Sequence, residues 1–132
     1  TADDIYYDTM VFPLAIDMPM MPGDTGYTYN TMQAVKAIMT DPHMTGVHTS
    51  LGLSNCVQNL PGRKLGVCRA YLEVAAKYGL DGAIVNMFHQ YSSKPADPDL
   101  VELVERFAAL DGSAENTDQA MMAMPDFCQK CR

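Results

Sequence analysis

The amino-acid sequence predicts an α/β fold in which short strands and helices alternate along the chain. Three observations lead to this prediction: short apolar runs suited to buried strands, amphipathic runs with helical spacing, and turn residues between them. Buried strands that alternate with helices indicate a parallel sheet covered by helices. A chain of 132 residues is long enough for one domain with one hydrophobic core.

The first strand–helix unit begins near the N-terminus. Ile5–Tyr7 and Val11–Ile16 are apolar and predict strand, with Asp8 between them. A loop rich in Pro, Gly and Met is expected from Asp17 to Tyr29, which is longer than most such connections. A helix should follow and end at Asp41-Pro42, because proline disfavours a helical residue before it. The apolar residues of that helix recur at helical spacing: Met32, Val35, Ile38 and Met39.

The second unit has the clearest pattern. Val47–Leu53 is an apolar run that predicts a buried strand, and it ends at the polar pair Ser54-Asn55. A Pro-Gly turn and an amphipathic helix follow, with Glu73 and Lys77 spaced to pair across one turn on its outer face. The residues expected on the buried face of this helix are Leu65, Cys68, Leu72 and Ala75.

The third unit starts with the apolar run Leu80–Val85, which predicts another buried strand, and a loop through Met87–Lys94. Asp97 can cap the next helix, with Pro98 in its first position. Its apolar positions are Leu100, Leu103, Val104 and Phe107. After Asp111-Gly112 the pattern weakens, and the remaining residues predict a short helix or a tail.

Composition narrows the possible functions. The net charge of −7 and the lack of a basic stripe argue against a nucleic-acid partner. No apolar run approaches the roughly 18 residues that span a bilayer, and the first residues do not resemble a signal peptide, so we expect a cytoplasmic protein without a membrane partner. The four cysteines are placed as in a reduced protein. Cys128 and Cys131 have the spacing of half a zinc site, which alone does not predict a metal.

Each predicted strand ends in a residue that can hydrogen-bond strongly: Asp8, Asn55 and Asn86. In parallel α/β folds, ligands bind at the carboxyl ends of the strands. The three residues therefore indicate a candidate binding site at one edge of the sheet.

Three segments carry a family resemblance: Gly52-Leu53-Ser54-Asn55, Pro61-Gly62-Arg63, and the run LDGAIV that follows Gly79. In this order, the chain resembles the pterin-binding methyltransferases, which include the methyltetrahydrofolate:corrinoid methyltransferases and the folate domain of cobalamin-dependent methionine synthase. The resemblance implies a TIM (β/α)8 barrel. Residues 1–110 would supply about its last three βα units, and residues 111–132 a C-terminal helix or tail.

The resemblance also implies a reaction, the transfer of a methyl group between N5 of methyltetrahydrofolate and a corrinoid (cobalamin) carried by a partner protein. Asn55 would be catalytic, because an amide can accept a hydrogen bond from a protonated N5 or donate one to a neutral N5. Asp8 would bind the pterin ring, since a carboxylate accepts two parallel N–H bonds. The other residues expected to contact the folate are Gly52, Ser54, Gln58, Arg63 and Asn86.

The resemblance implies further partners, because this chain would supply only about three of the eight βα units of the barrel. Three βα units leave open sheet edges, so we expect either a remaining barrel segment or a second subunit, and a homo-oligomer. Cys56-Val57-Gln58-Asn59 and Gly82 depart from common family members. Two alternatives remain open at this point: an enzyme like dihydropteroate synthase, and a pterin-binding or assembly subunit without catalysis. His89 is expected to be a packed or solvated loop residue.

Overall fold

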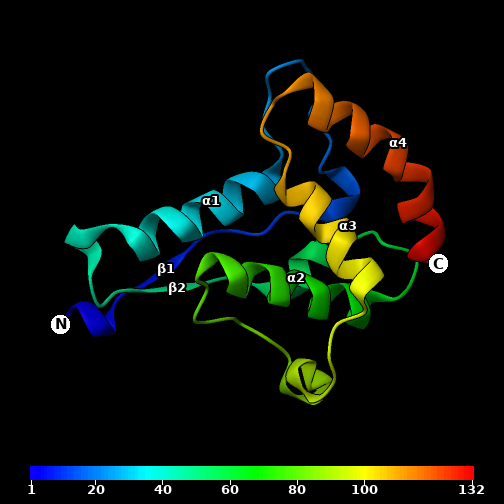
Figure 1. The fold of residues 1–132 in the computed structure, drawn as a ribbon. Helices are drawn as coiled ribbons and strands as arrows, with labels where there is room; N and C mark the ends of the chain where they lie inside the picture. The colour runs from blue at the N-terminus through cyan, green and yellow to red at the C-terminus, as the bar shows by residue number, and fades with distance from the viewer.

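The strands form a small parallel layer. The computed structural model describes residues 1–132, in which β1 (Tyr6–Asp8) pairs in parallel with β2 (His48–Ser50) (Figure 1). Beyond β2, Gly52 forms a single parallel bridge with Ile84. The three extended segments therefore lie side by side in chain order, as expected for consecutive strand–helix units.

Four α-helices are the main regular elements of the chain. They are α1 (Tyr27–Thr40), α2 (Lys64–Tyr78), α3 (Pro98–Ala108) and α4 (Ala114–Lys130). The mixed helix–strand organisation predicted from sequence is confirmed. The prediction of a short helix or tail at the end was too modest, because α4 is the longest helix and buries Ala120, Ala123 and Phe127.

Three of the expected strands are absent or shorter than predicted. Val11–Ile16 is not a strand: Val11 and Leu14 are buried, but Leu14–Ile16 forms a 3₁₀ turn. Leu80–Val85 contributes only the bridge at Ile84. Of the predicted strand Val47–Leu53, only β2 (His48–Ser50) is strand, and Leu53 begins a 3₁₀ turn. An apolar run does not by itself specify strand pairing: in Val11–Ile16 only Val11 and Leu14 are buried, and no residue of Leu80–Val85 is fully buried.

The helix boundaries follow local capping. α3 begins as predicted, with Pro98 in its first position and the Asp97 carboxylate accepting a hydrogen bond from the backbone N–H of Asp99 at 3.0 Å. α1 begins at Tyr27, inside the region expected to be a loop. The cause is Asp17, whose buried carboxylate accepts hydrogen bonds from the first N–H groups of the helix, at Tyr27 (2.6 Å) and Thr28 (2.8 Å).

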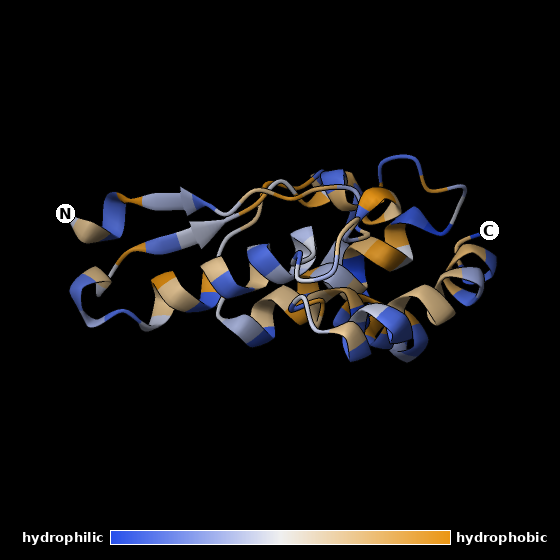
Figure 2. Cartoon of the chain, turned by 90° about the horizontal axis from the view of Figure 1, so that it is seen from above, coloured by the Kyte–Doolittle hydropathy of each residue, from blue (hydrophilic) through white to orange (hydrophobic).

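The helices cover one face of the strand layer and leave the other bare. Figure 2 shows the strands along one side of the molecule and the helices along the other. Thr49 and Leu51 point toward the helices and are fully buried. Side chains alternate along a strand, so His48, Ser50 and Gly52 face the opposite way. Their neighbours in register are Tyr6, Asp8 and Ile84, and we call these six residues the uncovered face.

The core lies around α2. Its buried face differs from the predicted one, since Leu65 is exposed while Cys68 and Ala75 are buried as expected. Lys77 does not pair with Glu73 but with Glu105 of α3, at 2.8 Å. The other fully packed residues of α2 are Val67, Ala70, Tyr71 and Val74. No helix of the chain combines the length and the apolar character needed to cross a membrane.

Candidate functional site

The candidate site lies where the extended segments end, at an edge that we call the C-terminal edge. It consists of Asp8, Ser50, Gly52, Asn55 and Asn86. Asp8 and Ser50 are direct neighbours in the register of β1 and β2, and Gly52 follows on the same uncovered face. The structure thus places Asp8 and Gly52 on one side of the layer, as a shared ligand requires.

Asp8 is exposed and is held by its own turn. Its Oδ1 accepts a hydrogen bond from the backbone N–H of Met10 at 2.8 Å. Met10 has a φ of 55°, so a non-glycine residue adopts the left-handed region directly after the strand. Oδ2 of Asp8 has no partner within the protein and can accept a hydrogen bond from a ligand.

Asn55 sits in the 3₁₀ turn Leu53–Val57, which begins where β2 and the Gly52–Ile84 bridge end. Its side chain is half-buried, and its Oδ1 accepts a hydrogen bond from Nε2 of Gln58 at 3.0 Å. Its Nδ2 faces Gly52, where an added Cβ would lie 3.4 Å from that nitrogen. Asn55 is therefore oriented by Gln58, while its Nδ2 donates to no protein acceptor.

The other residues of this turn are placed differently. Ser54 and Gln58 are exposed, and Gln58 reaches the site only through its bond to Asn55. Ser50 is a candidate that the sequence analysis did not single out. The alternation of side chains along β2, counted back from Gly52, is the signal that could have found it.

Arg63 is not brought together with Asn55. Its guanidinium donates to Oδ2 of Asp97 at 2.6 Å and to the carbonyl oxygen of Lys130 at 3.4 Å. The Arg63 hydrogen bond lowers the pKa of Asp97 below its ordinary value. In this structure Arg63 joins the start of α2 to α3 and to the end of α4.

Asn86 follows the third extended segment and is exposed. Its Oδ1 accepts a hydrogen bond from the N–H of Phe88 at 3.0 Å, which starts a short turn. It lines a shallow hollow together with Gln90 and Tyr91. His89 is held within this loop, with Nδ1 2.6 Å from the Tyr91 hydroxyl.

Backbone strain concentrates in the loops that leave the C-terminal edge. The non-glycine residues with positive φ are Met10, Asn59, Arg63 and Gln90. Met10 follows β1, Asn59 and Arg63 follow β2, and Gln90 follows the third segment. Each such residue costs of order 1 kcal/mol or more, and strain of this kind clusters at ligand sites.

Gly82 allows the third segment to approach β2 closely. A Cβ at this position would lie 3.0 Å from the carbonyl oxygen of Thr49 and 3.5 Å from the ring of Tyr6. The glycine at position 82 therefore has a packing reason. The absence of a side chain at Gly82 lets the segment that ends in Asn86 pack against β1 and β2.

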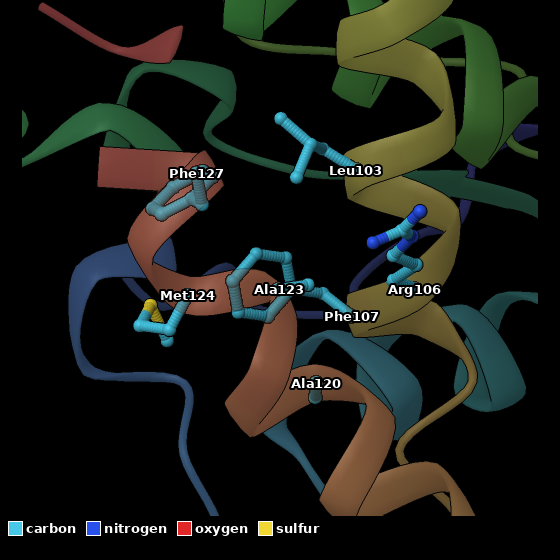
Figure 3. Close-up of a pocket in the computed structure, with 7 residues that line it drawn as sticks. All are labelled: Leu103, Arg106, Phe107, Ala120, Ala123, Met124 and Phe127. Carbon is cyan, nitrogen blue, oxygen red and sulfur yellow. The ribbon is translucent and has the colours of Figure 1, made fainter. Parts of the chain in front are cut away.

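The most enclosed cavity lies elsewhere, between α3 and α4. It measures about 10 Å³, room for about one water molecule, and its walls are apolar apart from Arg106 (Figure 3). The rings of Phe107 and Phe127 meet edge to face across it, with centroids 5.2 Å apart. It is a packing gap rather than a ligand site. No three His, Cys, Asp or Glu side chains are grouped to hold a metal ion.

Comparison with known proteins gives no further identification. No protein-family model matches the chain, and no curated protein matches it.

Proposed function

We propose that this chain is the C-terminal part of a pterin-binding TIM barrel that transfers a methyl group between methyltetrahydrofolate and a corrinoid protein. The observation that carries the proposal is Asn55. It stands in the 3₁₀ turn that follows β2, is oriented by Gln58, and has an Nδ2 that no protein group uses.

Asn55 suits the chemistry at N5. The methyl group leaves a tertiary amine, which is a poor leaving group until it gains a proton or a strong hydrogen bond. An amide held in one orientation can donate from Nδ2 to neutral N5, and the second lone pair of Oδ1 can accept from protonated N5. A hydrogen bond that strengthens as N5 changes its charge lowers the barrier to transfer more than it tightens binding.

Asp8 suits the other end of the ring. The aminopyrimidinone edge of a pterin presents neighbouring N–H donors, and a carboxylate accepts such donors well. Asp8 has one oxygen free and the other engaged only by the N–H of Met10. Gly52 and Ser50 carry little or no side chain between Asp8 and Asn55, so the backbone offers a flat surface to a ring.

The uncovered face fits the inside of a barrel. Parallel sheets are covered on both faces, yet Tyr6 and Ile84 here are 60% and 68% exposed. In a closed barrel these residues would be packed by side chains from the remaining strands, and the helices would stay outside. The remaining strands would come from another segment or a second subunit, and the corrinoid protein would dock at the C-terminal edge.

Single-turnover methyl transfer tests the proposal. Protein that includes this chain and the rest of its barrel is mixed with methyltetrahydrofolate and Co(I) cobalamin, and formation of methylcobalamin is followed by its absorbance. We expect transfer that depends on the protein. If the protein binds neither tetrahydrofolate nor methyltetrahydrofolate and gives no transfer above the uncatalysed rate, the proposal is wrong.

A further inference from the structure

Two buried cysteines lie together directly behind the candidate catalytic residue. Cys56 follows Asn55 in the 3₁₀ turn, and Cys68 lies in the second turn of α2. Their sulfur atoms are 3.9 Å apart, and both side chains are free thiols with at most 1% exposure. The disulfide bond length is about 2.05 Å, so the sulfurs must approach by less than 2 Å to join.

We propose that Cys56 and Cys68 form a reversible disulfide that switches the site at Asn55 off. The bond would close the segment between them into a loop, and that segment carries Gln58, which orients Asn55. Drawing the sulfur of Cys56 toward α2 moves its neighbour Asn55 and strains the hydrogen bond to Gln58. The disulfide itself does not depend on the proposed function, whereas its effect on methyl transfer rests on it.

The environment of the pair assigns a role to each sulfur. The hydrogen bond between the two sulfurs lowers the pKa of Cys68, and the Tyr91 hydroxyl acts in the same direction. The same contact with Cys68, together with burial, raises the pKa of Cys56. We assign the first attack to Cys68, whose thiolate form is favoured by the contact with Cys56 and by the Tyr91 hydroxyl.

The reaction balances with a peroxide as the oxidant. The Cys68 thiolate attacks one oxygen of hydrogen peroxide, and the O–O bond breaks to give a sulfenic acid and hydroxide, which takes up a proton to become water. The Cys56 sulfur then attacks the Cys68 sulfur, forms the S–S bond, and displaces the second water as its own proton leaves. The two thiols lose two electrons, and the peroxide gains them.

The segment between the two cysteines is the part of their surroundings that is most exposed and most strained. The segment between the cysteines contains Asn59 and Arg63, both with positive φ, and its residues 58, 59, 61 and 63 to 65 are exposed. Loops with few buried contacts open locally more readily than the core does. Small oxidants should therefore reach the thiols at a modest rate under native conditions.

Peptide mapping tests the bond directly. The native protein is treated with a small excess of hydrogen peroxide, remaining thiols are blocked, and the protein is digested with trypsin without reduction. Cleavage after Lys36, Arg63, Lys64 and Arg69 places Cys56 in residues 37–63 and Cys68 in residues 65–69. We expect these two peptides to be joined, with a mass about 2 Da below their sum and release by dithiothreitol.

The other cysteine pair provides the internal control. A bond between Cys128 and Cys131 would instead join residues 107–130 to the C-terminal dipeptide. Oxidation in guanidinium chloride should give mixed pairings, because proximity is then lost. Oxidation of Cys128 and Cys131 alone, with Cys56 and Cys68 still reduced, would overturn the proposal.

A second measurement tests the switch and separates it from the proposed function. The side-chain amide signals of Asn55, assigned in an NMR spectrum with the Asn55→Asp variant, should shift on oxidation and return on reduction. They should stay fixed under peroxide in Cys68→Ser. A joined peptide pair with unmoved Asn55 signals would overturn the switch. Absence of methyl transfer in the fully reduced protein would instead count against the proposed function and leave the disulfide unaffected.

Discussion

The two edges of the strand layer are built in opposite ways. At the N-terminal edge, which we define as Asp3, His48 and Asp81, polar groups satisfy one another. His48 contacts Asp81 through Nδ1 at 2.5 Å and Asp3 through Nε2 at 2.9 Å, and Tyr6 stacks on its ring at 4.6 Å. At the C-terminal edge, Oδ2 of Asp8 and Nδ2 of Asn55 have no protein partner.

The difference separates a structural edge from a candidate ligand-binding edge. The protonated form of His48 can donate to both carboxylates, and the ring then ties the N-terminal segment to the other two strands. The C-terminal edge has strained loops and leaves Oδ2 of Asp8 and Nδ2 of Asn55 free to bind a ligand. In parallel α/β barrels the same division holds between the stabilising and the catalytic ends.

The largest expected effect concerns the uncovered face, which lies between the two edges. Chain 1–132, expressed alone, should self-associate or aggregate, because β1 and the third segment have unpaired edges and exposed Tyr6 and Ile84 beside them. Sedimentation velocity across a range of protein concentrations measures this. A monodisperse monomer that unfolds cooperatively would mean that the uncovered face needs no cover, which would remove the argument for a barrel.

Replacing Asn55 should affect the chemical step most strongly at the C-terminal edge. Asn55→Ala in the complete barrel should reduce the single-turnover methyl-transfer rate about a hundred- to thousand-fold, corresponding to about 2.7–4 kcal/mol for one preorganised hydrogen bond. Folate affinity should change much less, because the bond strengthens only as N5 changes its charge. Asn30→Ala, an exposed site on α1, is the matched control. A wild-type rate for Asn55→Ala would remove Asn55 from the chemistry.

Replacing Asp8 should weaken binding rather than slow the chemistry. Asp8→Asn keeps an oxygen for the N–H of Met10 but loses the charge that a pterin would use. The expected loss is about 1.5–3 kcal/mol, or about 10- to 150-fold in tetrahydrofolate affinity by titration calorimetry. Asp24→Asn, an exposed loop site, should leave the affinity unchanged. Equal affinities for all three proteins would make Asp8 a turn residue only.

The smallest expected effect is a pH dependence at the N-terminal edge. The hydrogen bonds to Asp81 and Asp3 raise the pKa of His48 above 6.5. The folded state then holds a proton that the unfolded state releases, so this stabilisation is complete below pH 6.5 and is lost as pH rises through the folded pKa.

Asp81 sets the lower limit of the pH range over which this cluster stabilises the fold. Partial burial raises the pKa of Asp81, but the hydrogen bonds from His48 and Thr49 outweigh burial and leave that pKa below 3.8. This second contribution is present above pH 3.8 and is lost as pH falls through the folded pKa. The melting temperature of His48→Gln should therefore lie below that of wild type by a few degrees near pH 5 and approach it at high pH. His43→Gln, at an exposed histidine paired only with Asp41, is the matched control.

The sequence predicted the helices better than the strands. Asp97-Pro98 determined the start of α3 because a cap and a proline act locally. The start of α1 was missed because its cap, Asp17, lies ten residues away and acts through the folded chain. The strand at Val11–Ile16 was wrong because Val11 and Leu14 are buried without strand pairing.

The candidate site was also predictable only in part, because some of its contacts are local in the sequence and others form only through the folded chain. The polar strand ends Asp8 and Asn55 could be read from the sequence, since their neighbours define where each apolar run stops. The hydrogen-bond and packing partners that fix the side chains could not be read from the sequence. The bond between Arg63 and Asp97 spans helices far apart in sequence, and the contact between Cys56 and Cys68 requires α2 to fold against the turn.

A chemical-shift titration tests the central claim most directly, that the C-terminal edge binds the folate ring and the N-terminal edge does not. Tetrahydrofolate is added to the isotopically labelled complete protein, and backbone and side-chain amide signals are followed. We predict saturable shifts at Gly52, Asn55 and Asn86, with His48 and Asp81 unmoved. No saturable shift at the C-terminal edge, or shifts centred on His48 and Asp81, would contradict the account.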